Sequence, residues 1–322
     1  MAPGVRPVIC PLCSQETDRL LSESLRSGPG KVHFCPGCDL AFLDPASLPD
    51  PETYYATRYR QEHGPVIGKV SDAAEVFAAH VDYQQARLDL LSPHLTLATE
   101  LLEIGCSCGQ FLHHAIGRAG RVAGIDYNPD HTAFARDRLG CDIFTGPPEK
   151  APFAPASFDI VCAFQTLEHA PAPVAFIGTM ARFLKPGGLL VLEVPNLYDP
   201  LRSVYDCEAY RSFYFHEAHL FYFSGKSLAA TAARAGFAGT LHYVQDYNLT
   251  NHLHWVHRNA PQPNCHLGLG EARLPLSPAC PPEAEAALDA WAQEAGRSYK
   301  AVLAGLGLTD NVTFLGRRMA GA

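Results

Sequence analysis

The sequence of 322 residues shows no long apolar run, no pattern typical of a leader peptide and no excess of basic residues. No apolar run reaches the ~18 residues of a membrane helix, and the start has no basic region followed by an apolar one. We therefore expect no membrane partner and a cytoplasmic location. The formal net charge of −8 offers phosphate backbones no broad attraction, so we expect no nucleic-acid partner. A content of 47% hydrophobic and 18% charged residues is typical of a globular chain.

Signs of a disulfide framework are also missing, because the eleven cysteines are odd in number and no secretion signal precedes them. Four of them form two knuckles, Cys10-Pro-Leu-Cys13 and Cys35-Pro-Gly-Cys38. Each knuckle can present two thiolates to one tetrahedral metal, which predicts a zinc ribbon over residues 1–48. Four thiolates close the coordination sphere, so the zinc is expected to be structural and to staple a short segment. A nucleic-acid finger is the competing use, but the segment has little basic face.

Predicted strands and helices alternate through the rest of the chain. Apolar strand patterns lie near residues 100–104, 121–126, 141–145, 158–163 and 188–194. This alternation predicts an α/β fold with a parallel sheet, right-handed crossovers and a ligand at the carboxyl ends of the strands. Further strands are expected over 238–245 and 311–317.

Residues 101–112 are the most informative segment, because a buried strand breaks there into a turn of small residues and opens a helix. Gly105, Ser107 and Gly109 let backbone N–H groups approach a ligand at a helix N-terminus. About 20 residues further on, the next strand ends in Asp126, which can bind ribose hydroxyls. This combination permits NAD, FAD or S-adenosylmethionine (SAM).

Three details favour SAM among these cofactors. An acid, Glu103, precedes the turn, and Ser107 stands where a dinucleotide site needs a second glycine to admit pyrophosphate. Downstream, residues 158–169 form a strand pattern with a polar tip, and residues 183–193 form a helix end, a Pro-Gly-Gly turn and a strand. In this order and spacing the segments resemble the class I SAM-dependent methyltransferase family, over roughly residues 98–246. That family usually closes its sheet with an antiparallel last strand, which the resemblance places on residues 311–317.

The resemblance implies which residues bind SAM. The turn and the start of its helix would cradle the methionine end, the acid would bind the ribose, and the following tyrosine would pack on adenine. The tip of the fourth strand would lie beside the methionine moiety. The expected cofactor contacts are Glu103, Gly105, Cys106, Ser107, Gly109, Phe111, Asp126, Tyr127, Phe164 and Gln165.

Candidate bases lie on the loops at the strand ends, because methyl transfer from a sulfonium depends on positioning and on removing a proton from the acceptor. His169 follows the fourth strand, where a structural role near the cofactor is equally open. An aromatic loop over residues 196–223 carries Glu217, His219 and Tyr222. A histidine close to a carboxylate can serve as an oriented general base.

A two-knuckle zinc module joined to this core is similar to a family of sugar C-methyltransferases that act on nucleotide-linked keto-sugars. The Tyr-His-Glu-His stretch of that family is matched by residues 215–219, with Phe215 in place of the tyrosine and an extra alanine before His219. The resemblance places the base on His219, its acidic partner on Glu217 and a further histidine on His169. That family also carries a larger carboxyl-terminal sugar domain, for which this chain is too short. The resemblance therefore supports a sugar substrate less well than it supports the zinc module and the core.

The sequence thus predicts a Rossmann-like class I methyltransferase sheet with an N-terminal zinc ribbon and a helical insertion before the last strand. The expected segments are a ribbon (1–48), a linker and leading helix over the cofactor site (49–97), a SAM-binding core (98–246), a loop and helical insertion (247–309), and the last strand with the C-terminus (310–322). A single amphipathic helix is expected over 72–92. The linker tyrosines Tyr54, Tyr55 and Tyr59 would line the cofactor cover or pack against the ribbon.

The predicted function is methylation of a small-molecule acceptor, a sugar or a specialised metabolite, at carbon or oxygen, with SAM as cofactor and a histidine as base. One alternative is an RNA-modifying methyltransferase that grips RNA with its ribbon. The other is a scaffold that keeps the methyltransferase fold without its activity. The sequence carries no signal for the oligomeric state.

Overall fold

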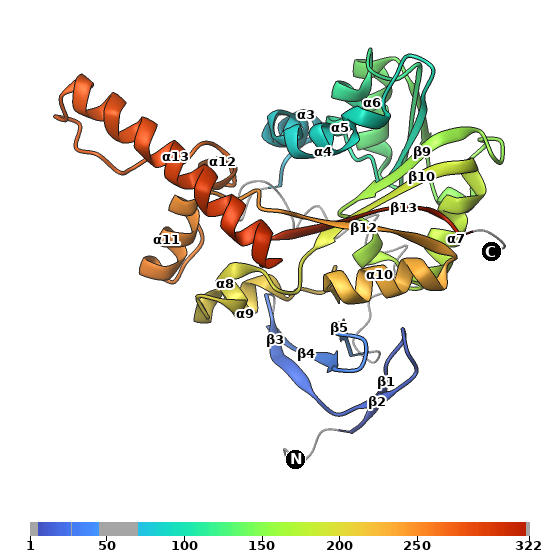
Figure 1. Cartoon of the computed structure of the whole chain (residues 1–322), viewed down its shortest axis with the longest axis horizontal. Helices are drawn as coiled ribbons and strands as arrows, with labels where there is room; N and C mark the ends of the chain where they lie inside the picture. Colours follow the sequence, from blue (N-terminus) through green and yellow to red (C-terminus); the bar gives the residue numbers. More distant parts are fainter. Residues whose placement is uncertain (1–5, 27, 45–69, 320–322) are drawn as a thin grey trace.

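A computed structural model describes residues 6–26, 28–44 and 70–319 of the chain (Figure 1). These residues form a large seven-stranded sheet with helices on both sides and a small β module at the N-terminal end of the chain. Tyr54, Tyr55 and Tyr59, for which the sequence predicts a place over the cofactor or against the ribbon, lie outside the described residues.

The large sheet has the strand order β12-β13-β10-β9-β6-β7-β8. Its strands are β6 (Glu100–Ile104), β7 (Arg121–Asp126), β8 (Asp142–Thr145), β9 (Phe158–Phe164), β10 (Leu184–Pro195), β12 (Phe237–Val244) and β13 (Asn311–Arg318). The neighbours from β10 to β8 pair in parallel, whereas β13 is antiparallel to both β10 and β12. The predicted α/β fold class, with an antiparallel last strand, is confirmed.

Helices connect the strands and cover both faces of this sheet. They are α5 (Gln110–Ala115), α6 (Pro129–Leu139), α7 (Pro173–Phe183) and α10 (Gly225–Arg234). Figure 1 shows α5 and α6 on one side of the sheet and α7 and α10 on the other. Because β9 is covered on both faces, its sequence is almost continuously apolar and all but one of its residues are buried.

The single helix predicted over residues 72–92 is wrong, because the segment is broken in the middle. It consists of helix α3, a 3-10 turn and helix α4, with the bounds Ala73–His80, Val81–Tyr83 and Gln85–Leu91. The side-chain amide of Gln84 donates to the His80 carbonyl at 2.8 Å. That carbonyl would accept the backbone N–H of residue 84 in a continuous helix, so the side chain replaces the helical bond and the chain can turn.

Three helices lie between β12 and β13, namely α11 (Leu249–Arg258), α12 (His266–Leu269) and α13 (Pro282–Leu306). Helix α13 has 25 residues and projects from the sheet as an arm in Figure 1. It ends at Gly307, whose left-handed φ of 69° lets the chain turn into β13. The predicted helical insertion before the last strand is therefore present. None of the helices in the described ranges combines the length and the apolar character needed to cross a membrane.

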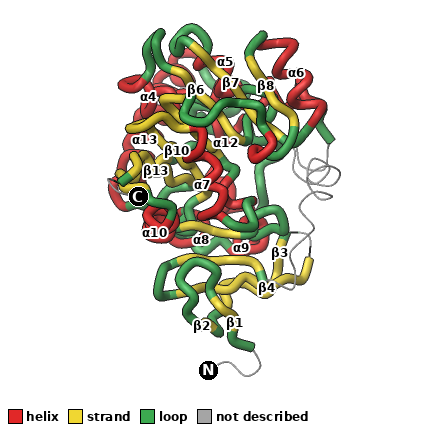
Figure 2. The backbone as a smooth tube through the Cα atoms, turned by 90° about the vertical axis from the view of Figure 1, so that its right-hand side faces the viewer, coloured by secondary structure: helices red, strands yellow, loops and turns green. Residues whose placement is uncertain are grey.

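The N-terminal module contains five short strands, β1 (Val8–Ile9), β2 (Glu16–Thr17), β3 (Leu20–Leu25), β4 (Gly28–Cys35) and β5 (Leu40–Leu43). Strands β3, β4 and β5 form a four-stranded sheet whose fourth member, β11 (Phe221–Phe223), comes from the middle of the chain. Figure 2 shows this module beneath α8 (Pro200–Ser203), α9 (Glu208–Tyr214) and α10. We call residues 6–26 and 28–44 the ribbon.

Candidate functional site

A cavity of about 870 Å³ lies at the carboxyl ends of the parallel strands. Strand β6 has β9 on one side and β7 on the other, so the strand order reverses there, and open α/β sheets bind ligands at such a point. Nine predicted cofactor contacts line the cavity: Glu103, Gly105, Cys106, Ser107, Phe111, Asp126, Tyr127, Phe164 and Gln165. The tenth, Gly109, is the N-cap of α5 and is not part of the lining.

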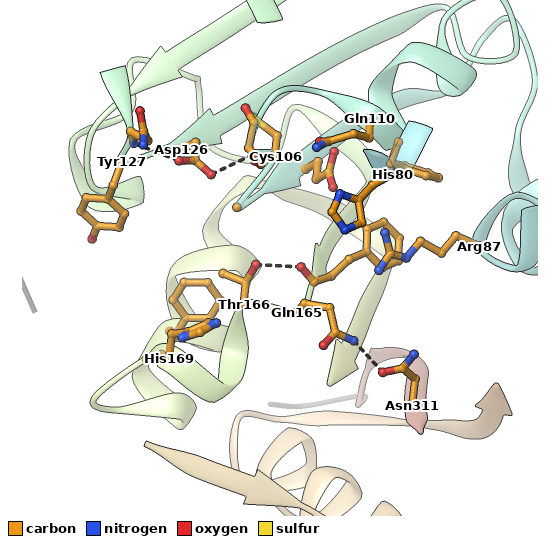
Figure 3. A pocket seen from close by; sticks show the side chains of 18 of the residues that line it. His80, Arg87, Cys106, Gln110, Asp126, Tyr127, Gln165, Thr166, His169 and Asn311 are labelled. Atoms are coloured by element: carbon orange, nitrogen blue, oxygen red, sulfur yellow. Dashed lines mark hydrogen bonds between the residues drawn. The ribbon is translucent and has the colours of Figure 1, made fainter. Parts of the chain in front are cut away.

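The turn after β6 brings backbone close to the space where a ligand would lie. Gly105 has a φ of +83°, and a Cβ there would meet the Thr166 hydroxyl at 2.1 Å, so a larger residue does not fit. Asp126 at the end of β7 organises this turn, because its carboxylate accepts the backbone N–H of Ser107 at 2.8 Å and that of Asn128 at 2.9 Å. The acid expected at the ribose thus also fixes the turn (Figure 3).

Glu103, near the carboxyl end of β6, is a buried carboxylate beside the cavity. It is 4% exposed, and its Oε2 has no hydrogen-bond partner among the described residues. Burial raises the pKa of Glu103 to about 8, while the nearby Arg87 charge acts in the opposite direction. A buried carboxylate without a partner fits a cationic group, and the amino group of SAM is such a group.

Arg87 on α4 is the only lysine or arginine among the described residues that line the cavity. Its guanidinium donates to Glu193 at 2.5 and 3.0 Å and to the side chain of Gln84 at 2.8 Å, and lies over the Phe164 ring at 4.6 Å. These contacts fix a positive charge at the cavity wall, suited to a carboxylate ligand. The sequence does not predict a role for Arg87, because the leading helix is recognised by its apolar face and Arg87 is not part of that face.

Gln165 follows β9 and links the end of this strand to the start of β13. Its backbone is left-handed, with a φ of 51°, a conformation that a non-glycine residue adopts at a cost and that often marks a functional position. Its side chain donates to Asn311 at 2.9 Å, and Asn311 donates to Asp246 at 2.8 Å. Asn311 and Asp246 line the cavity too. The sequence gives little sign of them, because they lie at opposite ends of the long insertion.

A buried carboxylate, Glu168, joins two of the predicted catalytic histidines. Its Oε1 lies 3.8 Å from His169 Nε2 and 3.7 Å from His219 Nε2, and the two imidazole rings are 4.8 Å apart. His169 donates from Nδ1 to the Ala218 carbonyl at 2.7 Å, which leaves Nε2 as the basic nitrogen. Neither oxygen of Glu168 has a hydrogen-bond partner among the described residues, and burial raises its pKa to about 8.

The four predicted catalytic residues do not all reach the cavity, since only His169 lines it. The carboxylate beside His219 is Glu168, whereas Glu217 has no hydrogen bond or ion pair with the described residues. Tyr222 is 1% exposed, and its hydroxyl donates to the His216 carbonyl at 2.9 Å and accepts the N–H of His216 at 2.8 Å. Tyr222 thus fixes the backbone of the loop that carries His219.

The four knuckle cysteines meet in one cluster, with all their Sγ atoms within 4.8 Å of one another. Cys10 and Cys38 approach to 3.5 Å and Cys13 and Cys35 to 3.4 Å, and all four are free thiols. Four sulfur atoms around one centre, without a disulfide, fit a tetrahedral zinc ion.

Comparison with known proteins places the chain in a family. A model described as a methyltransferase domain matches residues 77–242, and the chain belongs to this family. A Mycolicibacterium smegmatis protein named "Probable S-adenosylmethionine-dependent methyltransferase" is 34% identical over 32% of this chain and 40% of its own length. A ubiquinone biosynthesis O-methyltransferase of Azoarcus sp. is 30% identical over 39% of this chain and 57% of its own. The chain spans about half the length of the curated relatives it matches.

Two solved structures illustrate the more distant similarity. A SAM dependent methyltransferase from Archaeoglobus fulgidus is 16% identical, with a TM-score of 0.49, covering 75% of this chain and 96% of that chain. DesVI of Streptomyces venezuelae is 24% identical, with a TM-score of 0.30, covering 37% of this chain and 50% of that chain. The prediction of a class I SAM-dependent methyltransferase core is confirmed by the family match.

Proposed function

We propose that this protein is a SAM-dependent methyltransferase that methylates a small-molecule acceptor at carbon or oxygen. The observation that carries the proposal is one continuous cavity that extends from the turn after β6 to His169. Such a cavity can hold a methyl donor and a small acceptor next to each other. The ubiquinone biosynthesis O-methyltransferases among the relatives support a small acceptor.

The described residues suit each part of SAM. Asp126 would bind the ribose hydroxyls and Tyr127, which is 52% exposed, would cover the adenine. Glu103 would bind the amino group of the methionine moiety, and Arg87 its carboxylate, because each offers the opposite charge. Bound SAM would supply the methyl group on a sulfonium. The four cysteines of the ribbon would hold one structural zinc ion.

The histidine pair would remove the proton of the acceptor. His169 lines the cavity and has its basic Nε2 directed towards Glu168, so we assign the proton-accepting role to this nitrogen. The ionised form of Glu168 would stabilise the resulting imidazolium, and its side chain would hold His219 in the same cluster. This assignment moves the base from His219 to His169 and its acidic partner from Glu217 to Glu168.

The proposal is tested by S-adenosylhomocysteine binding, metal analysis and turnover with a panel of small acceptors. We expect one zinc ion per chain and saturable binding of S-adenosylhomocysteine. His169→Ala should keep this binding and lose turnover by about 100-fold or more, as removal of a general base does. His242→Ala, on β12, is the matched control and should change neither. Wild-type protein that fails to bind S-adenosylhomocysteine would contradict the proposal, and two metal ions per chain would assign a second ion to Glu168, His169 and His219.

A further inference from the structure

We propose that the ribbon positions the acceptor site, because it fixes the loop that carries His219 and the Ala218 carbonyl to which the cavity residue His169 donates. The assignment of this loop to an acceptor site rests on the proposed function, whereas the contacts described below do not depend on that function. Metal binding would then act at two places, on the fold of the ribbon and on the placement of His219. We call residues 213–223 the His219 loop.

The downstream end of the His219 loop is a strand of the ribbon's own sheet. Strand β11 pairs with β5 in antiparallel register, so that Tyr222 lies opposite Ala41. The N–H of Leu43 extends the ladder by donating to the Leu220 carbonyl at 3.0 Å. Because β5 begins two residues after the zinc-ligand candidate Cys38, the position of this end follows from the second knuckle.

The upstream end of the His219 loop is held by Arg26, which directly follows β3 of the ribbon. The N–H of Arg26 donates to the Phe215 carbonyl at 2.7 Å. The guanidinium of Arg26 donates to the Phe213 carbonyl at 2.8 Å and lies 3.8 Å above the Phe213 ring. The ribbon therefore holds the loop on both sides of His216 and His219.

Tyr222 transmits the position of β11 to the turn between these two anchors. It lies on β11, and its hydroxyl bonds to both the N–H and the carbonyl of His216. The N–H of His219 in turn donates to the His216 carbonyl at 3.2 Å, which closes the turn. A shift of β5 would therefore move β11, Tyr222 and the backbone that sets the ring of His219.

The metal-binding turns themselves dock on the core of the molecule. Gly37, inside the second knuckle, accepts a hydrogen bond from Lys226 at 3.0 Å, and Leu12, inside the first knuckle, accepts one from Arg234. These two cations lie near the opposite ends of α10. A zinc ion that joins the knuckles would thus fix the distance between the Gly37 and Leu12 carbonyls. Both carbonyls could then accept their hydrogen bonds from α10 at the same time.

The cofactor end of the cavity has no such dependence. Its turn is held by Gly105 and Ser107, which lie between β6 and β7, and by Asp126, which ends β7. The ribbon has no strand pairing with either of these strands. Loss of zinc should therefore loosen the His219 loop and leave cofactor binding intact.

The test is amide hydrogen exchange of the full chain, measured by mass spectrometry together with zinc content and S-adenosylhomocysteine affinity. Chelation, or the Cys38→Ser substitution, should speed exchange in residues 213–223 at least about tenfold while residues 101–112 and the affinity stay unchanged. Tyr222→Phe should keep the zinc and the affinity, and should speed exchange around His216 by about tenfold, as loss of a hydrogen bond does. Tyr205→Phe, which loses a comparable phenolic bond to Tyr299, is the control and should leave this region unchanged.

Unchanged exchange of the His219 loop in both the chelated protein and Tyr222→Phe would overturn the proposal. Loss of S-adenosylhomocysteine binding together with zinc would also overturn it, because the ribbon would then support the whole fold rather than the loop. If Cys38→Ser does not fold, Tyr222→Phe decides alone, since it changes no zinc ligand. Absence of S-adenosylhomocysteine binding in a zinc-loaded protein with a zinc-dependent loop would instead reject the methyltransferase proposal and leave this one standing.

Discussion

Burial of the Glu103 carboxylate should make the affinity for the cofactor depend on pH. Its pKa is raised to about 8, so the free protein holds this group largely protonated at neutral pH. A cationic amino group beside it favours the ionised form, and binding should then release a proton. The affinity for S-adenosylhomocysteine should rise with pH up to about 8 and level off above it.

Titration calorimetry at neutral pH, in two buffers with different ionisation enthalpies, measures the released proton directly. Glu103→Gln cannot ionise, so the variant should bind without proton release and with a flat pH profile over the same range. An equal proton release in wild type and variant would assign the titrating group elsewhere.

Burial of Glu168 should likewise make the free energy of unfolding depend on pH. Burial raises its pKa from 4.5 in the reference state to about 8 in the folded protein, so the folded state holds the proton more tightly than the unfolded state. The contribution of this proton to the free energy of unfolding is complete below about pH 4.5 and is lost as the pH rises through about 8. Glu168→Gln should therefore flatten the fall in stability over this window, by up to about 1.4 kcal/mol per pH unit. Urea unfolding of both proteins across the window checks this, and parallel profiles would contradict it.

The residues that the sequence could and could not predict differ in how local their signals are. Cys10, Cys38, Gly105 and Asp126 belong to short motifs with fixed spacing; the two cysteines lie in one cluster, and Gly105 and Asp126 line the cavity. The role of Glu168 is not predicted although this residue precedes His169. The sequence carries no signal that His219, from a distant loop, lies beside it. Pairings of this kind arise only when distant segments pack together.

At the scale of elements, α4 is joined to β10 by a charged pair that serves both stability and binding. Arg87 and Glu193 are linked by two hydrogen bonds, and Glu193 is 2% exposed. Arg87→Met leaves that carboxylate buried without its cation and should destabilise the protein by about 3 kcal/mol. It should also weaken S-adenosylhomocysteine binding at least about tenfold, since the ligand carboxylate loses its partner.

The double variant Arg87→Met with Glu193→Gln separates these two effects. Removing the buried charge should restore most of the stability, while the affinity stays low. Thermal unfolding and calorimetry of the wild type, Arg87→Met and the double variant give the comparison. Recovery of the affinity in the double variant would show that Arg87 acts only through the fold.

The elements follow the sequence closely where a long periodic pattern determines them. The strands of the large sheet begin and end within a few residues of the predicted bounds, because their apolar patterns are flanked by turn residues. The break between α3 and α4 was missed, since it depends on a side-chain bond from Gln84 that no periodicity reveals. The three-residue strand β11 exists only because β5 lies beside it, so its pattern alone could not identify it.

At the scale of the whole molecule, one hydrophobic cluster runs from the ribbon to the large sheet. It includes Cys10 and Phe42 of the ribbon, Tyr222 on β11, and Val161 and Phe314 of the large sheet. Small independent modules unfold separately, but a shared core couples their transitions. We therefore expect the zinc-loaded chain to unfold in a single calorimetric transition to which the ribbon contributes.

Removing zinc should then lower the temperature of that transition, because the free energy of metal binding is added to a shared core. S-adenosylhomocysteine should raise the transition temperature both with and without zinc, since its cradle lies on β6 and β7, outside the ribbon. Scanning calorimetry of the four states measures both shifts in one experiment. A separate low-temperature transition that disappears on chelation, with the main transition unmoved, would mean that the ribbon folds apart from the sheet despite the continuous cluster.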